Sequence, residues 1–126
     1  KPLNAVGERD TWKIIDFDVF CTLGESFGSK VPSSGYCPPE MARVLLRAMN
    51  EQGKVDTSLL KEYRASEAYD LWSFGVLLYE LLVSTLPFGI DCEDSQSQVL
   101  HKIKNKKINE VRDFFPTPVS LSNQED

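Results

Sequence analysis

The longest apolar segment of the chain runs from Tyr69 to Val83 and predicts a helix that is buried on all sides. A helix with apolar residues all round lies inside a protein or inside a membrane. This segment is too short for a membrane span and is interrupted by Glu80. We therefore expect residues 69–84 to form the central helix of a helical domain, with Asp70 capping its first turn. The side chains that cover every direction of its helical wheel are Leu71, Trp72, Phe74, Val76, Leu77, Leu78, Tyr79, Leu81, Leu82 and Val83.

Two other segments have helical periodicity. The first begins at Pro38-Pro39-Glu40, because proline suits the first helical turn and an acidic residue complements the helix dipole there. Gly53 can end this helix. Its apolar positions fall on one face: Met41, Val44, Leu45, Ala48 and Met49. The second segment, residues 95–107, sets Val99, Leu100 and Ile103 against Lys102, Lys104, Lys106 and Lys107. Its lysines form either a solvated face or a docking surface.

The remaining segments predict a hairpin, a long loop and a tail. Residues 3–6 and 12–15 are rich in residues that favour strands, and turn-forming residues lie between them. Residues 16–36 have no clear period and read as a functional loop. A short helix is possible at 59–63. The polar, proline-containing residues 116–126 predict a disordered tail.

Composition and charge argue against several classes of partner and site. The 126 residues carry a net charge of −5, with 41% hydrophobic and 26% charged residues, which is typical of a globular domain. An acidic chain disfavours a basic surface for nucleic acid or acidic lipid, so we expect neither nucleic acid nor membrane as a partner. Three scattered cysteines and a single histidine disfavour a disulfide framework and a zinc site. These features favour a reduced, intracellular and cytoplasmic protein, and a start at Lys1 without methionine suggests a piece of a longer chain.

Short motifs with chemical meaning occur in a fixed order. They are Lys1-Pro2-Leu3-Asn4, Asp16-Phe17-Asp18, Gly35-Tyr36-Cys37-Pro38-Pro39-Glu40 and Asp70-Leu71-Trp72-Ser73-Phe74-Gly75. Each is weak alone. Together, the series resembles the second half of a eukaryotic-type protein kinase catalytic domain, which carries K-P-x-N, Asp-Phe-Gly, G-x-Y-x-A-P-E and D-x-W-S-x-G in this order. The resemblance covers roughly residues 1–88.

The resemblance implies a nucleotide site. Asp16 would chelate Mg²⁺, Asn4 would bind a second ion, and Lys1 would be the catalytic-loop lysine that steadies the transferred phosphate of ATP. Carboxylate and amide oxygens are the ligands that such hard cations prefer. A lysine at position 1 favours a protein substrate with Ser or Thr hydroxyls. Each residue also has a structural explanation: Asp16 could end a strand, Asn4 could bond its own turn, and Lys1 could be an ordinary surface lysine.

The family pattern assigns further residues. Glu40 would pair with an arginine beyond residue 126, so we expect it to be unpaired here. Asp70 resembles the residue that holds the catalytic-loop backbone. Ser33 matches the activation-segment position that contacts the catalytic aspartate, and Ser33 or Ser34 could be phosphorylated.

The sequence also departs from the family pattern. Asp18 replaces a glycine, which accepts a positive φ far more easily than aspartate does, and it adds negative charge beside a phosphate site. Pro38 replaces the usual alanine. Residues 47–66 resemble an insertion of unknown role.

The predicted fold is mainly α with a short β-hairpin, a partial C-terminal lobe of a protein-kinase-like fold over residues 1–115. Its segments are the catalytic-loop end, hairpin and metal motif (1–18), the activation segment (19–40), a helix plus insertion (41–68), the central buried helix (69–84) and a basic helix (95–107).

The sequence is compatible with three functions. The first is a fragment of a Ser/Thr protein kinase that is inactive in isolation, because the Gly-rich loop, the strand lysine and the catalytic base are not among these residues. The second is a pseudokinase or scaffold that keeps the fold for binding, which Asp18 favours. The third, a helical interaction module unrelated to kinases, requires the motifs to be coincidental.

Overall fold

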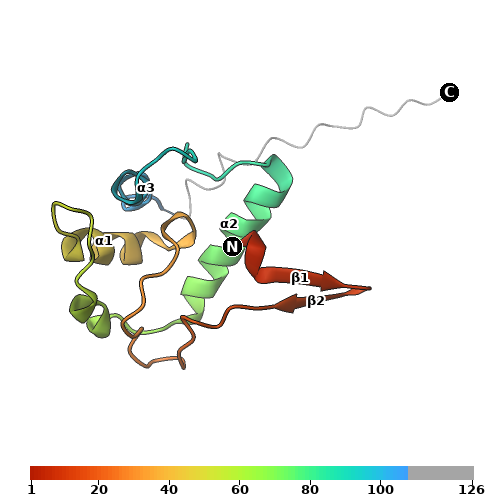
Figure 1. The fold of residues 1–126 in the computed structure, drawn as a ribbon, viewed down its shortest axis with the longest axis horizontal. Helices are drawn as coiled ribbons and strands as arrows, with labels where there is room; N and C mark the ends of the chain where they lie inside the picture. Colours follow the sequence, from red (N-terminus) through yellow and green to blue (C-terminus); the bar gives the residue numbers. More distant parts are fainter. Residues whose placement is uncertain (108–126) are drawn as a thin grey trace.

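The structure is a computed structural model that describes residues 1–107. A two-stranded hairpin lies on one side of the long helix α2, and the helices α1 and α3 lie on the other side (Figure 1). The described part of the chain is therefore mainly helical with a short hairpin, as predicted. The predicted domain end at residue 115 and the predicted tail at 116–126 lie outside the described residues.

The hairpin forms where the alternation of turn and strand residues predicts it. A 3₁₀ turn, η1 (Pro2–Asn4), leads into β1 (Ala5–Glu8), which pairs antiparallel with β2 (Thr11–Ile14). The register sets Ala5 opposite Ile14 and Glu8 opposite Thr11. Arg9 turns the chain with a φ of 55°. Two strands alone are marginally stable in water, and here both strands remain mostly exposed.

The hydrophobic core lies between α1 (Pro39–Ala48) and α3 (Gln96–Ile103). Both predicted helices are confirmed, and the predicted periodicity selects the faces that are buried. Ser95 begins α3 with a capping box, in which its hydroxyl accepts from the Gln98 N–H and the Gln98 side chain accepts from the Ser95 N–H. The buried side chains from the two helices are Met41, Ala42, Leu45, Ala48, Val99, Leu100 and Ile103.

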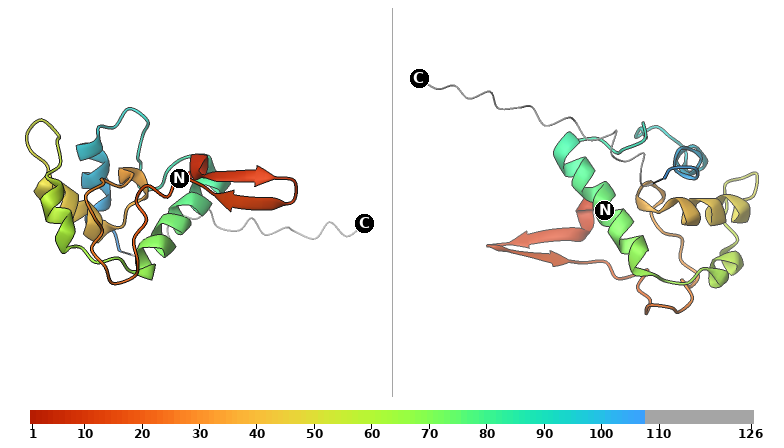
Figure 2. Two further views of the ribbon diagram at one scale, coloured as in Figure 1. Left: turned by 60° about the horizontal axis from the view of Figure 1, so that its bottom comes forward. Right: turned by 180° about the vertical axis from the view of Figure 1, so that it is seen from behind.

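The predicted burial of the central helix on all sides is wrong for this chain. α2 (Glu67–Val83) forms as predicted, yet Val76 is its only buried residue. Leu71 is 69% exposed and Leu82 is 74% exposed. The reason is visible in Figure 2, where the other helices cover α2 from one side only. Apolar residues all round a helix show that its whole surface favours burial. The described residues bury only part of that surface.

The start of α2 also differs from the prediction. Ser66 is the N-cap residue, and Asp70, the predicted cap, lies about one helical turn beyond it. The Asp70 carboxylate therefore does not cap the helix, although it still complements the helix dipole. Ser84 ends α2 in the left-handed conformation, with a φ of 63°.

The predicted loop is largely irregular but is anchored at its middle and its end. Phe27 is buried against the rings of Tyr63 and Tyr69, and Ser26 bridges to Arg64. The loop ends in a 3₁₀ turn, η2 (Ser34–Tyr36). A second such turn, η3 (Thr57–Glu62), replaces the short helix expected at 59–63.

The segment interpreted as an insertion belongs to the fold. Leu60 in η3 is fully buried and joins the core beside α1. Within the described chain, no helix combines the length and the apolar character required to cross a bilayer.

Candidate active site

The structure brings Asn4 and Asp16 to the same end of the hairpin. The Asn4 carbonyl accepts a hydrogen bond from the Ile15 N–H at 2.9 Å, which adds one rung beyond the Ala5–Ile14 pair. Asp16 is the next residue along the chain, so its backbone begins beside that of Asn4. The hairpin register, a product of the turn at its far end, thus determines which residues meet here.

Asp16 has an unusual backbone conformation. Its φ is 67°, in the left-handed region that L-residues rarely adopt, and its side chain is exposed. Aspartate is one of the few residues that visit this region readily. The conformation ends the strand abruptly and turns the following residues away from the hairpin.

Lys1 lies at the same place. Burial and its own side-chain ammonium lower the pKa of the Lys1 amino group, whereas the negative charges of Glu80 and Asp16 act in the opposite direction. Asp16 is therefore within electrostatic range of Lys1. The structure brings together all three residues predicted for the site: Lys1, Asn4 and Asp16.

The donor set fits a magnesium ion held jointly with phosphates. Mg²⁺ is commonly bound through one or two protein oxygens, with water and substrate phosphates completing its shell. One carboxylate and one side-chain amide are available, and no ion pair among the described residues occupies Asp16. Residues 1–107 contain no group of three or more His, Cys, Asp or Glu side chains that would bind a metal without such help.

Asp18 does not strain the backbone at the position where the family has glycine. Its φ is not positive, so the substitution of the family glycine causes no left-handed strain at this residue. Its carboxylate forms an ion pair with Lys30 at 2.9 Å. Both side chains are exposed, so the pair is weak, but it offsets charge near the site.

The end of the predicted activation segment is fixed to α2. The Tyr36 hydroxyl donates to the Glu80 carboxylate at 2.6 Å, and the Ser73 hydroxyl donates to the Tyr36 carbonyl at 2.8 Å. Partial burial and the Glu80 carboxylate raise the pKa of Tyr36. This role of Glu80 was not predicted from the sequence, although a charge in the middle of an apolar segment was a signal that the residue has a partner.

Ser33 and Glu40 lie on either side of Tyr36 in the sequence. Ser33 is exposed and makes no capping hydrogen bond. Glu40 forms no ion pair among the described residues. It lies near Tyr63, where burial and the negative charge of Glu40 raise the pKa of the tyrosine to about 12. Asp70 makes no hydrogen bond to the Lys1–Asn4 backbone in the described chain.

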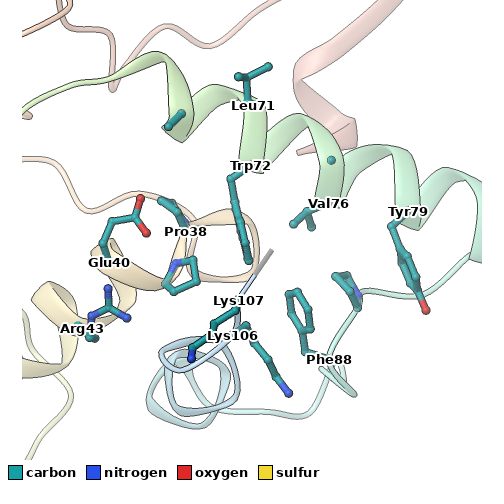
Figure 3. Close-up of a pocket in the computed structure, with 14 residues that line it drawn as sticks. Pro38, Glu40, Arg43, Leu71, Trp72, Val76, Tyr79, Phe88, Lys106 and Lys107 are labelled. Carbon is teal, nitrogen blue, oxygen red and sulfur yellow. The ribbon is translucent and has the colours of Figure 1, made fainter. Parts of the chain in front are cut away.

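An apolar groove of about 690 Å³ lies beneath α2 (Figure 3). Trp72 lines it and stacks on Phe88, with ring centroids 5.9 Å apart. The Trp72 indole nitrogen is buried and has no hydrogen-bond partner, which is uncommon for a buried donor. The groove is thus another surface where the described residues provide incomplete cover.

Comparison with known proteins identifies the class. A family model described as "Protein kinase domain" matches residues 1–125. The chain is 34% identical over 130 residues to the maternal embryonic leucine zipper kinase of Danio rerio. It is 36% identical over 66 residues to the protein kinase C-like 1 of Caenorhabditis elegans. No solved structure matches the chain.

The chain therefore belongs to the protein kinase domain family, and the resemblance carried by its motifs is confirmed. The first match covers 98% of this chain and 16% of the Danio rerio kinase, and the second covers 52% of this chain and 8% of the Caenorhabditis elegans kinase. The 126 residues thus span a small part of the relatives that they match.

Proposed function

We propose that this chain is part of a Ser/Thr protein kinase that transfers the γ-phosphate of ATP to protein hydroxyls, with Mg²⁺ as cofactor. The proposal places the protein inside the cell, where ATP and its substrates occur. The observation that carries it is the hydrogen bond from the Ile15 N–H to the Asn4 carbonyl, because it fixes an amide and a carboxylate at one end of the hairpin.

Each residue has a chemical role in this proposal. Phosphoryl transfer depends on positioning and on neutralising charge, and bound Mg²⁺ supplies much of that neutralisation. Asp16 and Asn4 offer oxygens to the metal ions. The Lys1 ammonium would lie beside the transferred phosphate and stabilise its charge. The left-handed backbone of Asp16 holds the carboxylate at the end of the strand.

The metal assignment can be tested on the 126-residue chain. Mn²⁺ is a paramagnetic substitute for Mg²⁺, and we expect it to broaden the NMR signals of the Asn4 side-chain amide and the Asp16 backbone amide. Asp16→Asn should abolish this broadening. Asp10→Asn is the matched control, because Asp10 is an exposed aspartate in the hairpin turn away from the site. Equal broadening in both variants would overturn the assignment.

Activity is tested in the full-length parent. Asp16→Asn should reduce phosphate transfer to a Ser-containing protein by at least about a hundredfold, while Asp10→Asn leaves it unchanged. Undiminished transfer in the Asp16 variant would contradict the proposed role. Metal binding at Asp16 in a parent that transfers no phosphate would instead favour the scaffold function, for which the substitution at Asp18 is the supporting observation.

We further propose that the 126 residues alone transfer no phosphate. The apolar side of α2 and the hairpin are exposed, so this chain holds its nucleotide residues on an incompletely supported framework. Purified chain incubated with labelled ATP and a protein substrate should incorporate no label. Incorporation that Asp16→Asn removes would contradict this.

A further inference from the structure

A second groove, of about 640 Å³, lies between α1 and α3. Its basic lining comes from both helices. Arg43 and Arg47 are one turn apart on α1, and His101 and Lys104 are one turn apart at the end of α3. Because residues three or four apart share one face of a helix, each pair projects from a single face.

The charge of this lining is opposite to that of the whole chain. Arg43, Arg47 and Lys104 are cationic and Glu40 is the lone carboxylate, in a protein whose net charge is −5. His101 adds an exposed imidazole. Random placement of charge on an acidic protein does not favour such a concentration, and a groove lined by one sign of charge attracts ligands of the other.

Arg43 is held in place by a hydrogen bond, and the cations of the groove are not neutralised by ion pairs among the described residues. The Arg43 guanidinium donates to the Lys104 carbonyl at 2.6 Å, which links the two helices without using a carboxylate. Among the described residues, ion pairs occupy Lys13, Lys30 and Lys102, and none occupies Arg43, Arg47 or Lys104. Lys102, on the same helix, is by contrast paired with Asp94.

The single carboxylate in the groove lies beside a phenol. The negative charge of Glu40 raises the pKa of Tyr63, and the positive charge of Arg43 acts on the same phenol in the opposite direction. Arg47, His101 and Lys104 therefore add hydrogen-bond donors to a groove that contains one carboxylate. Arginine forms paired hydrogen bonds with planar or tetrahedral anions, which suits carboxylates and phosphates alike.

From this geometry we infer that the groove between α1 and α3 is a docking site for an anionic segment of a protein partner. The shared chemistry is a set of anionic oxygens on a peptide, from glutamate and aspartate side chains or from a phosphorylated residue. The cations come from two different helices, so a peptide with several anionic side chains can contact both helices at once. That the partner is also a phosphorylation substrate rests on the proposed function; binding itself does not.

Peptide binding to the 126-residue chain tests the inference without ATP, so its failure is independent of the proposed kinase activity. Fluorescence anisotropy would follow a labelled glutamate-rich peptide, the same peptide with glutamines, and a phosphoserine peptide. We expect the glutamine peptide not to bind. The ratio between the two anionic peptides then identifies which source of anionic oxygens the groove prefers.

Charge reversal locates the site. Arg47→Glu combined with Lys104→Glu should weaken binding by about tenfold or more, because it turns an attractive groove into a repulsive one. Lys54→Glu combined with Lys61→Glu is the matched control: it makes the same change of charge at two exposed lysines that do not line the groove. Higher salt should weaken binding to the unaltered chain.

Several results would overturn the inference. One is equal loss of binding in the Lys54/Lys61 control variant, which would mean that the peptide responds to the net charge of the protein and not to this groove. Another is binding of the glutamine peptide as tight as that of the glutamate peptide. Tighter binding of phosphatidylserine vesicles than of either anionic peptide, lost in the same double variant, would assign the groove to a lipid surface. A circular dichroism spectrum unchanged by the substitutions confirms that the variants fold.

Discussion

Single residues in this molecule carry roles that depend on one or two partners. Tyr36 is such a residue, because its hydroxyl donates to Glu80 and its carbonyl accepts from Ser73. Both bonds join the predicted activation segment to α2. A hydrogen bond to a charged acceptor contributes more to stability than one between neutral groups.

We predict that Tyr36→Phe lowers the free energy of unfolding by about 1.5–3 kcal/mol, since it removes the donor and leaves the Glu80 carboxylate part-buried and unpaired. Urea denaturation followed by circular dichroism measures this. Glu80→Gln retains an acceptor and should cost less. If the double variant loses the sum of the two single losses, the residues do not interact and the assignment is wrong.

The cysteines provide a second prediction at this scale. Cys37 is fully buried, and burial raises the pKa of its thiol to about 12. Cys92 is exposed. Because the thiolate is the reactive form, a thiol reagent at mildly alkaline pH should modify Cys92 at once and Cys37 only when the protein unfolds.

Labelling followed by mass spectrometry, with a Cys21→Ser/Cys92→Ser variant that leaves only Cys37, measures these rates. Urea at the unfolding midpoint should accelerate the modification of Cys37. Rapid modification of Cys37 in the native protein would contradict its burial.

At the scale of elements, the packing of α1 on α3 provides the core, and α2 contributes little to it. Leu45 on α1 is fully buried, whereas Leu82 on α2 is 74% exposed. Free energy gained from burial scales with the apolar area removed from water, so equal substitutions at these leucines should have unequal effects.

We expect Leu45→Ala to destabilise the chain by about 2–5 kcal/mol and Leu82→Ala by less than about 0.5 kcal/mol. The same truncation at both positions makes the pair a matched comparison. Thermal or urea unfolding of the 126-residue chain gives both values. A large loss at Leu82 would mean that α2 is covered in solution and that the exposed face is not free.

Local sequence patterns are sufficient to predict some elements of this fold but not all of its buried residues. The periodicity of Met41, Leu45 and Ala48 predicted α1, and turn-forming residues 7–10 between two strand-favouring segments predicted the hairpin, because both patterns act over a few neighbouring residues. Leu60 was not expected in the core, since a short 3₁₀ turn has no period long enough to show which residue is buried.

For the whole molecule, acid sensitivity follows from a group of aspartates. The Ser58 hydroxyl, followed by the Ser58 N–H, lowers the pKa of Asp56. Hydrogen bonds from backbone amides lower the pKa values of Asp91 and Asp94, and Lys102 lowers that of Asp94 further. A depressed pKa in the folded state contributes stability above the pKa of the unfolded chain. That stability is lost as pH falls through the folded pKa.

The chain should therefore become easier to denature with urea as pH falls from neutral to about 3, through the range in which aspartates protonate. Asp94→Asn should reduce this pH dependence, because its amide cannot protonate in that range. Asp10→Asn, at an exposed aspartate with no resolved interaction, is the control. A pH dependence identical in all three proteins would contradict the role of Asp94.

The residues of the candidate site could be predicted from the sequence, but the long-range contacts beside them could not. Lys1, Asn4 and Asp16 were identified from their motifs, and their proximity follows from the hairpin register that short-range turn chemistry sets. The partners Tyr36–Glu80 and Glu40–Tyr63 join residues far apart in the sequence. No local pattern encodes such a pair, because the contact exists only after the helices pack.

The sequence by itself determined the hairpin, the helical faces and the family of this protein, since these depend on spacing between near neighbours and on the order of motifs. Tertiary structure alone decided that α2 is covered on one side, that Asp18 pairs with Lys30, and that Arg47 and Lys104 share a groove. The physical reason is the same in each case. Burial and charge pairing depend on which distant segments meet, and a linear pattern shows only what each segment could bury or pair.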